Sequence, residues 1–235
     1  LSAPESPPPE PARAEKPKLA AVLDELDADT TRDAAAAALL RAWSLAAVSD
    51  YPAGGSTEAL EAFLADNDLD YETIEPATDQ LLTINRPAFV RMRHGQEDYW
   101  LALLRADERR FTLSADHGET IEVSRDIFSE HYAGKAVVPW RDARPTAPDL
   151  LQGTRGKQVA ELKRTLRALG RLKTDNTSPI YGMNTARAVA RVQAETGTLV
   201  DGIAGRQVRM VLSGWQGDDA NPVLRPKEAE LAAAP

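Results

Sequence analysis

The sequence predicts an α+β domain followed by a small domain of three short helices. Between residues 19 and 67, apolar residues recur every three or four positions, as they do on one face of a helix. Between residues 81 and 138 the pattern changes to short apolar runs separated by turns, which is typical of antiparallel strands. Residues 150–212 return to helical spacing, with glycines where short helices end.

Three helices are predicted before the strands. The first begins near Leu19, and the second spans about residues 32–48 and contains the alanine run of residues 34–38. The third starts after Ser56, whose hydroxyl can accept a hydrogen bond from the first helical turn, and reaches about Asn67.

Five short apolar runs predict the strands of an antiparallel sheet. They are residues 88–92, 99–104, 111–113, 121–123 and 137–138. Residues 81–84 fit either a short strand or the end of a helix. A turn at residues 116–118 joins two of the strands, and Ser124 caps a helix that we expect Gly134 to end.

Proline-rich segments divide the chain. Residues 1–18 contain Pro7-Pro8-Pro9 and predict an extended linker, and residues 141–148 predict a second one. The predicted regions are a linker at 1–18, a first domain at 19–142, a second domain at 148–217 and a tail at 218–235 that carries a short helix near residues 228–233.

The composition excludes several classes of function. The chain has no cysteine, which excludes disulfides, thiolate metal sites and a cysteine nucleophile. Its three histidines, His94, His117 and His131, form no zinc-binding motif, and no phosphate-binding glycine loop occurs. We therefore expect no metal and no cofactor. No apolar run approaches the ~20 residues of a membrane span. Because the chain begins with Leu1 and carries no signal peptide, we expect a fragment of a longer protein.

Charge is divided unevenly along the chain. Residues 150–217 hold eleven Lys and Arg against four Asp and Glu, whereas residues 1–149 hold fifteen against twenty-eight. A basic second domain on an acidic first domain predicts an anionic partner, for which nucleic acid and peptidoglycan are both candidates by charge.

The second domain carries the most specific pattern. Its first helix has an apolar face ended by Gly170, and glycine turns at residues 180–185 and 201–205 lead into two further helices. This ordered pattern resembles the small peptidoglycan-binding domain of bacterial cell-wall proteins. The sequence departs from that family at Lys163 and Val208, which we expect at surface or turn positions.

The resemblance implies a non-covalent site between the glycine turns and the helix starts. Helix N-termini at residues 184–185 and 206–207 would offer backbone N–H groups to a carboxylate, Tyr181 could stack on a sugar or peptide face, and two arginines could pair with stem-peptide carboxylates. Asp201 could instead cap its own turn. The predicted peptidoglycan-binding residues are Tyr181, Asn184, Thr185, Arg187, Asp201, Arg206 and Gln207.

The first domain resembles the bacteriocin-processing type of papain-like cysteine peptidase, in the order of helices, central strand 98–103 and strand 111–116. In that family a cysteine lies on the first long helix and a histidine opens the central strand. Here the helix offers alanines, Asp98 replaces the histidine, and only Asp116 matches. Thiol catalysis needs both missing groups, so we expect a degenerate peptidase fold and no enzymatic activity in this fragment.

Together, the linker and the two domains resemble the periplasmic region of the general secretion pathway protein A family. The resemblance implies the periplasmic part of a bacterial inner-membrane protein whose full length carries an AAA ATPase and a membrane helix. It implies a role in assembling the secretin of type II secretion. The implied partners are peptidoglycan, secretion pathway protein B and the secretin, with a possible homo-oligomer and no nucleic acid.

Two alternatives remain open at this point. The fragment could be the targeting module of a wall hydrolase whose catalytic domain lies elsewhere in the protein. It could also be a protein-binding adaptor that has lost wall affinity, which the departures at Lys163 and Val208 allow.

Overall fold

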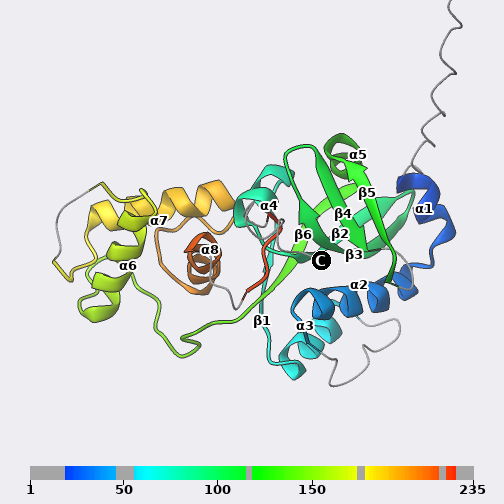
Figure 1. Ribbon diagram of the computed structural model, residues 1–235. Helices are drawn as coiled ribbons and strands as arrows, with labels where there is room; N and C mark the ends of the chain where they lie inside the picture. Colours follow the sequence, from blue (N-terminus) through cyan, green and yellow to red (C-terminus); the bar gives the residue numbers. More distant parts are fainter. Residues whose placement is uncertain (1–18, 46–55, 115–117, 174–177, 217–220, 226–235) are drawn as a thin grey trace, which may run out of the picture.

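The computed structural model describes residues 19–45, 56–114, 118–173, 178–216 and 221–225. A sheet domain lies beside a domain of three helices (Figure 1). The predicted linker at 1–18, the turn residues 116–117 and the predicted helix at 228–233 lie outside the described residues.

The sheet domain contains one six-stranded antiparallel sheet. Its spatial order is β1-β6-β2-β3-β4-β5. The strands are β1 Asp70–Ile74, β2 Ala88–His94, β3 Glu97–Ala106, β4 Arg110–Ser114, β5 Thr120–Ser124 and β6 Tyr132–Trp140. The five predicted strands all lie within this sheet, and the α+β class is confirmed.

Five helices in the described part of the chain belong to the sheet domain. They are α1 Leu19–Glu25, α2 Ala28–Ala42, α3 Thr57–Asp66, α4 Thr78–Ile84 and α5 Arg125–His131. Helix α2 packs against β3, and α5 lies at the opposite side of the sheet domain in the view of Figure 1. Three tryptophans lie in the core: Trp43, Trp100 and Trp140 are 5%, 7% and 1% exposed.

The structure differs from the predicted elements in three places. Helix α2 begins at Ala28 rather than Arg32, because the Asp27 carboxylate accepts a hydrogen bond from the backbone N–H of Thr30 at 3.1 Å. Residues 81–84, for which the sequence left a strand or a helix end open, are the end of helix α4. Helix α5 already ends at His131, so Gly134 lies inside β6 instead of ending the helix. Strand β1 was not predicted at all.

Serine caps begin two of the helices, as predicted. Ser56 precedes α3 and accepts a hydrogen bond from Ala59 N, and Ser124 precedes α5 and accepts one from Ile127 N. Replacing Ser56 with alanine should lower the free energy of unfolding by about 1 kcal/mol, since a helix N–H loses its acceptor. Ser56→Asp, which keeps a side-chain acceptor, should restore the value in urea denaturation. Equal stability of the alanine variant and the wild type would contradict the cap.

The second domain packs three helices around a small core. They are α6 Lys157–Ala168, α7 Met183–Thr196 and α8 Arg206–Gln216. Val159, Val189 and Val211 are among the buried residues that join them. Gly197 ends α7 with a φ of 67°, and Gly170 has a φ of 69° just after α6, so both adopt the left-handed conformation that glycine favours.

Polar contacts hold the two domains together. Arg86 follows α4, is 1% exposed, and donates from Nη2 to Ser213 Oγ of α8 at 2.7 Å. Trp215 Nε1 donates to the carbonyl oxygen of Thr83 at 2.7 Å, and Gln80 Nε2 donates to the carbonyl oxygen of Ala194 at 3.0 Å. The two domains therefore have a specific, partly buried interface.

Residues 221–225, within the predicted tail, pack against the sheet domain. Leu224 is 1% exposed, and its carbonyl oxygen accepts a hydrogen bond from Ala106 N at the end of β3. Asn221 Oδ1 accepts from Arg141 N at 3.0 Å. This segment therefore returns from α8 to the sheet domain. Among the described helices, none is both long enough and apolar enough to cross a membrane.

Candidate functional site

A basic hollow of about 230 Å³ lies beside helix α7. Its lining residues are Leu172, Lys173, Asn184, Arg187 and Arg191. Two of them, Asn184 and Arg187, were predicted as site residues, and the structure brings them together here. Arg187 and Arg191 lie one turn apart on α7, so their side chains project from the same face of the helix.

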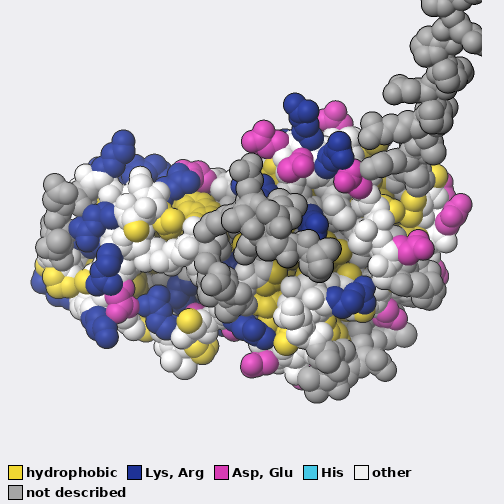
Figure 2. Space-filling model, viewed as in Figure 1, with side chains coloured by type: hydrophobic (Ala, Val, Ile, Leu, Met, Phe, Trp, Pro, Cys, Tyr) yellow, Lys and Arg dark blue, Asp and Glu magenta, His cyan; other side chains and the backbone are white. Residues whose placement is uncertain are grey.

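Among the described residues, the carboxylates around the hollow do not neutralise all of its positive charge. Arg171, next to Leu172, is paired with Glu195 at 2.7 Å, and its guanidinium lies 4.6 Å from the centre of the Trp215 ring. In the described part of the chain, no carboxylate forms an ion pair with Lys173 or Arg187. Figure 2 shows Lys and Arg side chains gathered over the three-helix domain, whereas most acidic side chains in this view lie over the sheet domain. Such a site suits an anionic ligand.

The predicted role of Tyr181 is wrong. Its side chain is 0% exposed, and its hydroxyl donates to the carbonyl oxygen of Gly202 at 2.7 Å. Burial raises the pKa of this hydroxyl, so Tyr181 stays neutral. A buried ring offers no face to a sugar. Thr185, 2% exposed, is likewise inside the domain rather than at a ligand surface.

Asp201 acts on its own turn, which is the alternative that the sequence left open. Its Oδ1 atom accepts hydrogen bonds from Ile203 N at 2.8 Å and from Gln193 Nε2 at 2.8 Å. The Gln193 side chain also accepts from Gly202 N at 2.8 Å. These bonds fix the turn that leads into α8, where Gln207 is half-buried.

Arg206 is engaged by the sheet domain and is not free to bind a stem-peptide carboxylate. Its Nε lies 2.8 Å from Glu72 Oε1, and its Nη2 lies 3.0 Å from Asp70 Oδ1. The hydrogen bond to Glu72 raises the pKa of Arg206. Strand β1 supplies both acidic partners, and because β1 was not predicted, this pairing could not be foreseen.

Sequence reasoning missed Lys173 and Arg191. A signal existed for Arg191, since it lies four residues after Arg187 on a predicted helix. No comparable signal existed for Lys173, which follows α6 after a glycine turn. Its place is set by packing across the domain, where Arg191 Nη2 donates to the carbonyl oxygen of Arg171 at 3.3 Å.

The departures at Lys163 and Val208 are not at surface positions, contrary to prediction. Lys163 is 3% exposed and donates from Nζ to the carbonyl oxygen of Ser178 at 2.8 Å, and burial lowers its pKa. Val208 is 1% exposed. Both residues serve the interior of the three-helix domain, so they give no support to a loss of wall affinity.

The sheet domain places Asp98 in an ion pair. Arg93 Nε lies 2.8 Å from Asp98 Oδ1, and this hydrogen bond lowers the pKa of Asp98. The carboxylate is thus held as an anion beside an arginine, at the position where the resemblance places a histidine. Asp116 lies outside the described residues. No cluster of three metal-ligating side chains occurs among the residues that the structure describes.

The segment that holds the basic hollow matches a known family. Residues 155–212 match the family model described as "Putative peptidoglycan binding domain". This match includes all five residues that line the hollow. No relative is found among curated proteins.

Solved structures similar to this chain are of the two kinds that the resemblance predicted. One is a periplasmic domain of the EpsAB fusion protein of the Vibrio vulnificus type II secretion system, with 16% identity, a TM-score of 0.41 and 80% of each chain covered. Another is the peptidase domain of Streptococcus ComA, with 11% identity, a TM-score of 0.41, and 50% of this chain and 95% of that chain covered. A third is the N-terminal peptidase C39 like domain of a Vibrio parahaemolyticus toxin secretion ATP-binding protein, at 12% identity and a TM-score of 0.41, covering 50% of this chain and all of that one. At these scores the likenesses carry no functional argument.

Proposed function

We propose that the three-helix domain binds peptidoglycan through the basic hollow beside α7. The proposal rests on the unpaired cations of this hollow, which lies in the segment that matches a peptidoglycan-binding family model. The hollow contains two cations, Lys173 and Arg187, that form no ion pair with any described carboxylate. Peptidoglycan stem peptides bear carboxylates, which accept charge-assisted hydrogen bonds from arginine and lysine. The Asn184 amide adds a donor and an acceptor for the neutral atoms of the ligand.

Reversing both of these charges tests this site. The double variant Lys173→Glu/Arg187→Glu should bind purified sacculi at least about tenfold more weakly, because two attractive contacts become repulsive. Co-sedimentation over a range of protein concentrations measures the affinity. Wild-type binding should also fall as salt rises from about 50 to about 300 mM, since exposed charges are screened.

A matched control distinguishes binding at the hollow from a general effect of the protein's net charge. Lys157 and Arg164 are exposed residues of α6 that do not line the hollow. Lys157→Glu/Arg164→Glu makes the same change in net charge and should bind nearly as well as the wild type. If both double variants lose affinity equally, or if neither loses any, the hollow is not the binding site. Arg206→Glu is a poor test, because it breaks the pairs with Asp70 and Glu72.

We propose further that the chain acts without catalysis in the periplasm and supports secretin assembly in type II secretion. The support is the order, in one chain, of a proline-rich segment, a cysteine-free sheet domain and a segment that matches a peptidoglycan-binding family model. Binding to the wall would hold the assembly machinery where the secretin crosses it. The targeting module of a wall hydrolase remains the second candidate, since the same matched segment would serve it.

A further inference from the structure

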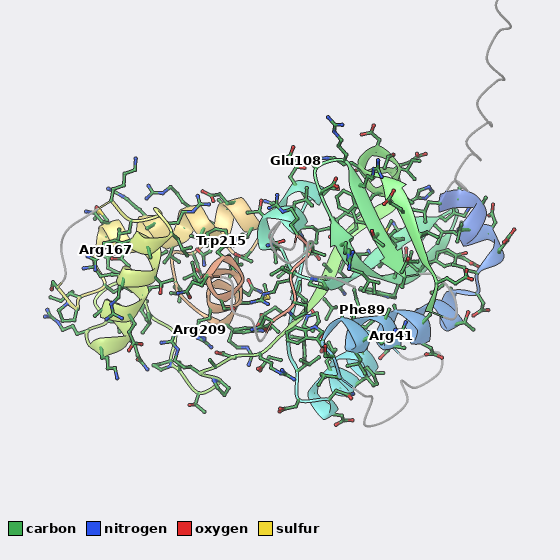
Figure 3. The ribbon with its side chains drawn as sticks, in the orientation of Figure 1. Arg41, Phe89, Glu108, Arg167, Arg209 and Trp215 are labelled. Carbon is green, nitrogen blue, oxygen red and sulfur yellow. The ribbon has the colours of Figure 1, made fainter. Side chains whose placement is uncertain are left out.

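A series of contacts connects the sheet domain to the basic hollow. Trp215 of α8 donates from Nε1 to the carbonyl oxygen of Thr83 in α4 at 2.7 Å. The guanidinium of Arg171 lies over the same indole ring, 4.6 Å from its centre. Figure 3 shows Trp215 on α8, between α6 and the sheet domain. Neither Trp215 nor Arg171 lines the hollow, but Arg171 immediately precedes Leu172 and Lys173, which do.

Arg171 is held by contacts to all three helices of its domain. Its backbone N–H donates to the carbonyl oxygen of Leu166 in α6 at 2.7 Å. Its carbonyl oxygen accepts a hydrogen bond from Arg191 Nη2 of α7 at 3.3 Å. Its Nη1 atom lies 2.7 Å from Glu195 Oε2, also on α7, and its guanidinium lies against Trp215 of α8. These contacts determine the direction of the chain after Arg171 and therefore the place of the next two residues at the hollow.

The hollow needs such support because its cations repel one another. Lys173, Arg187 and Arg191 line the same hollow of about 230 Å³. Like charges gathered at short range favour separation while no anion is bound between them. Arg187 and Arg191 are fixed on α7, whereas Lys173 follows the end of α6 and belongs to no helix. Lys173 is therefore the cation whose position depends on the contacts of Arg171.

We propose that docking of the sheet domain sets the geometry of the basic hollow, with Trp215 and Arg171 as positioning residues that act through Lys173. The sheet domain holds Trp215 through Thr83, Trp215 holds Arg171, and Arg171 keeps Lys173 beside Arg187. This inference rests on the proposed wall binding and adds its regulation. Wall affinity is high while the domains are docked and falls when they separate, which is a coupling between two distant equilibria.

Two replacements of Trp215 test the connection without changing the net charge. Trp215→Leu removes both the hydrogen bond to Thr83 and the ring against Arg171, and it should weaken sacculus binding about five- to tenfold. Trp215→Phe keeps a ring for Arg171 but removes the N–H group, and it should weaken binding about two- to threefold. Trp100→Phe, in the core of the sheet domain, should bind like the wild type. Co-sedimentation is run at a temperature at which circular dichroism shows each variant folded, so that lost stability alone does not lower the measured affinity.

A change of charge at Glu195 separates positioning from simple electrostatics. Glu195→Ala removes the carboxylate that pairs with Arg171. By charge alone, the domain becomes more positive and should bind an anionic wall more tightly. Because Glu195 positions Arg171, we expect the affinity to fall instead, by about two- to threefold. Glu161→Ala, which removes the partner of Arg144 from α6, makes the same change in net charge and should not weaken binding.

Arg86→Ala tests docking at a site away from Trp215. Arg86 does not line the hollow, and it contacts Met210 and Ser213 of α8 instead. Removing these contacts should loosen the docked arrangement and lower the sacculus affinity about threefold. Wild-type affinity in this variant, under conditions in which its two domains unfold separately, would overturn the control of the hollow by docking.

The binding site and the positioning role can fail separately. If Lys173→Glu/Arg187→Glu loses affinity while Trp215→Leu and Glu195→Ala bind as tightly as the wild type, the hollow binds the wall and the positioning role is overturned. Equal weakening in Trp215→Leu and Trp100→Phe would also overturn it, since any core replacement would then have the same effect. If the wild type does not bind sacculi, the proposed function and this inference are both overturned.

Discussion

Replacing Gln193 with leucine is expected to lower the free energy of unfolding by about 3–4 kcal/mol. Gln193 is 4% exposed, and its amide makes four hydrogen bonds to the turn before α8. The amide donates to Asp201 Oδ1 and to the carbonyl oxygen of Ile203, and it accepts from the backbone N–H groups of Asp201 and Gly202. Leucine has a similar volume but leaves those groups buried or poorly solvated, at a cost of about 1–3 kcal/mol for each unsatisfied group.

Urea denaturation followed by tryptophan fluorescence measures this change. Gln96→Leu serves as the control, because Gln96 is exposed in the turn between β2 and β3. The control should stay within about 0.5 kcal/mol of the wild type. A Gln193→Leu variant as stable as the control would show that the turn does not depend on the glutamine amide.

Replacing Arg86 with alanine is expected to lower the free energy of unfolding by about 3 kcal/mol and to loosen the two domains. Arg86 is fully enclosed between them, donates to Ser213 Oγ, and lies 3.4 Å from the carbonyl oxygen of Met210. Gly214 passes close to the guanidinium, since a Cβ atom at this glycine would lie only 3.2 Å from Arg86 Nε. Alanine at residue 86 removes the hydrogen bonds and leaves a cavity at the interface.

The separation of the domains can be measured directly. The wild type should unfold in a single transition, and the Arg86→Ala variant should show earlier unfolding of the three-helix domain, seen as two transitions in calorimetry. Arg93→Ala is the comparison, since it removes an exposed pair with Asp98 and should change stability by less than about 1 kcal/mol. An Arg86→Ala variant with one transition at the wild-type midpoint would contradict a coupling role.

The fold was largely predictable because most of its elements bury one regular face. Strand β3 and helix α6 show the expected periodicity, and Ser56 and Ser124 mark helix starts at their actual positions. Strand β1 could not be found in this way. Its sequence, Asp-Tyr-Glu-Thr-Ile, buries fully only its last residue, so no alternation of apolar and polar residues reveals it.

The candidate site was only partly predictable. Asn184 and Arg187, which line the hollow, could be picked out because they lie at a helix start that glycine marks in the sequence. Tyr181 and Arg206 were misjudged for a common reason. Tyr181 forms its hydrogen bond with Gly202, and Arg206 forms its ion pairs with the two acidic residues of β1, all distant in the chain. The local sequence pattern carries no information on such contacts.

The interface between the two domains also fixes the distance between their outer ends. Arg86, Arg206, Arg209 and Trp215 each bind a residue on the far side of the boundary or in the segment that crosses it. These contacts therefore hold the hollow beside α7 and the outer strand β5 at a constant distance from each other. A pull applied to the sheet domain is therefore transmitted to the three-helix domain through these contacts, without first stretching a flexible linker.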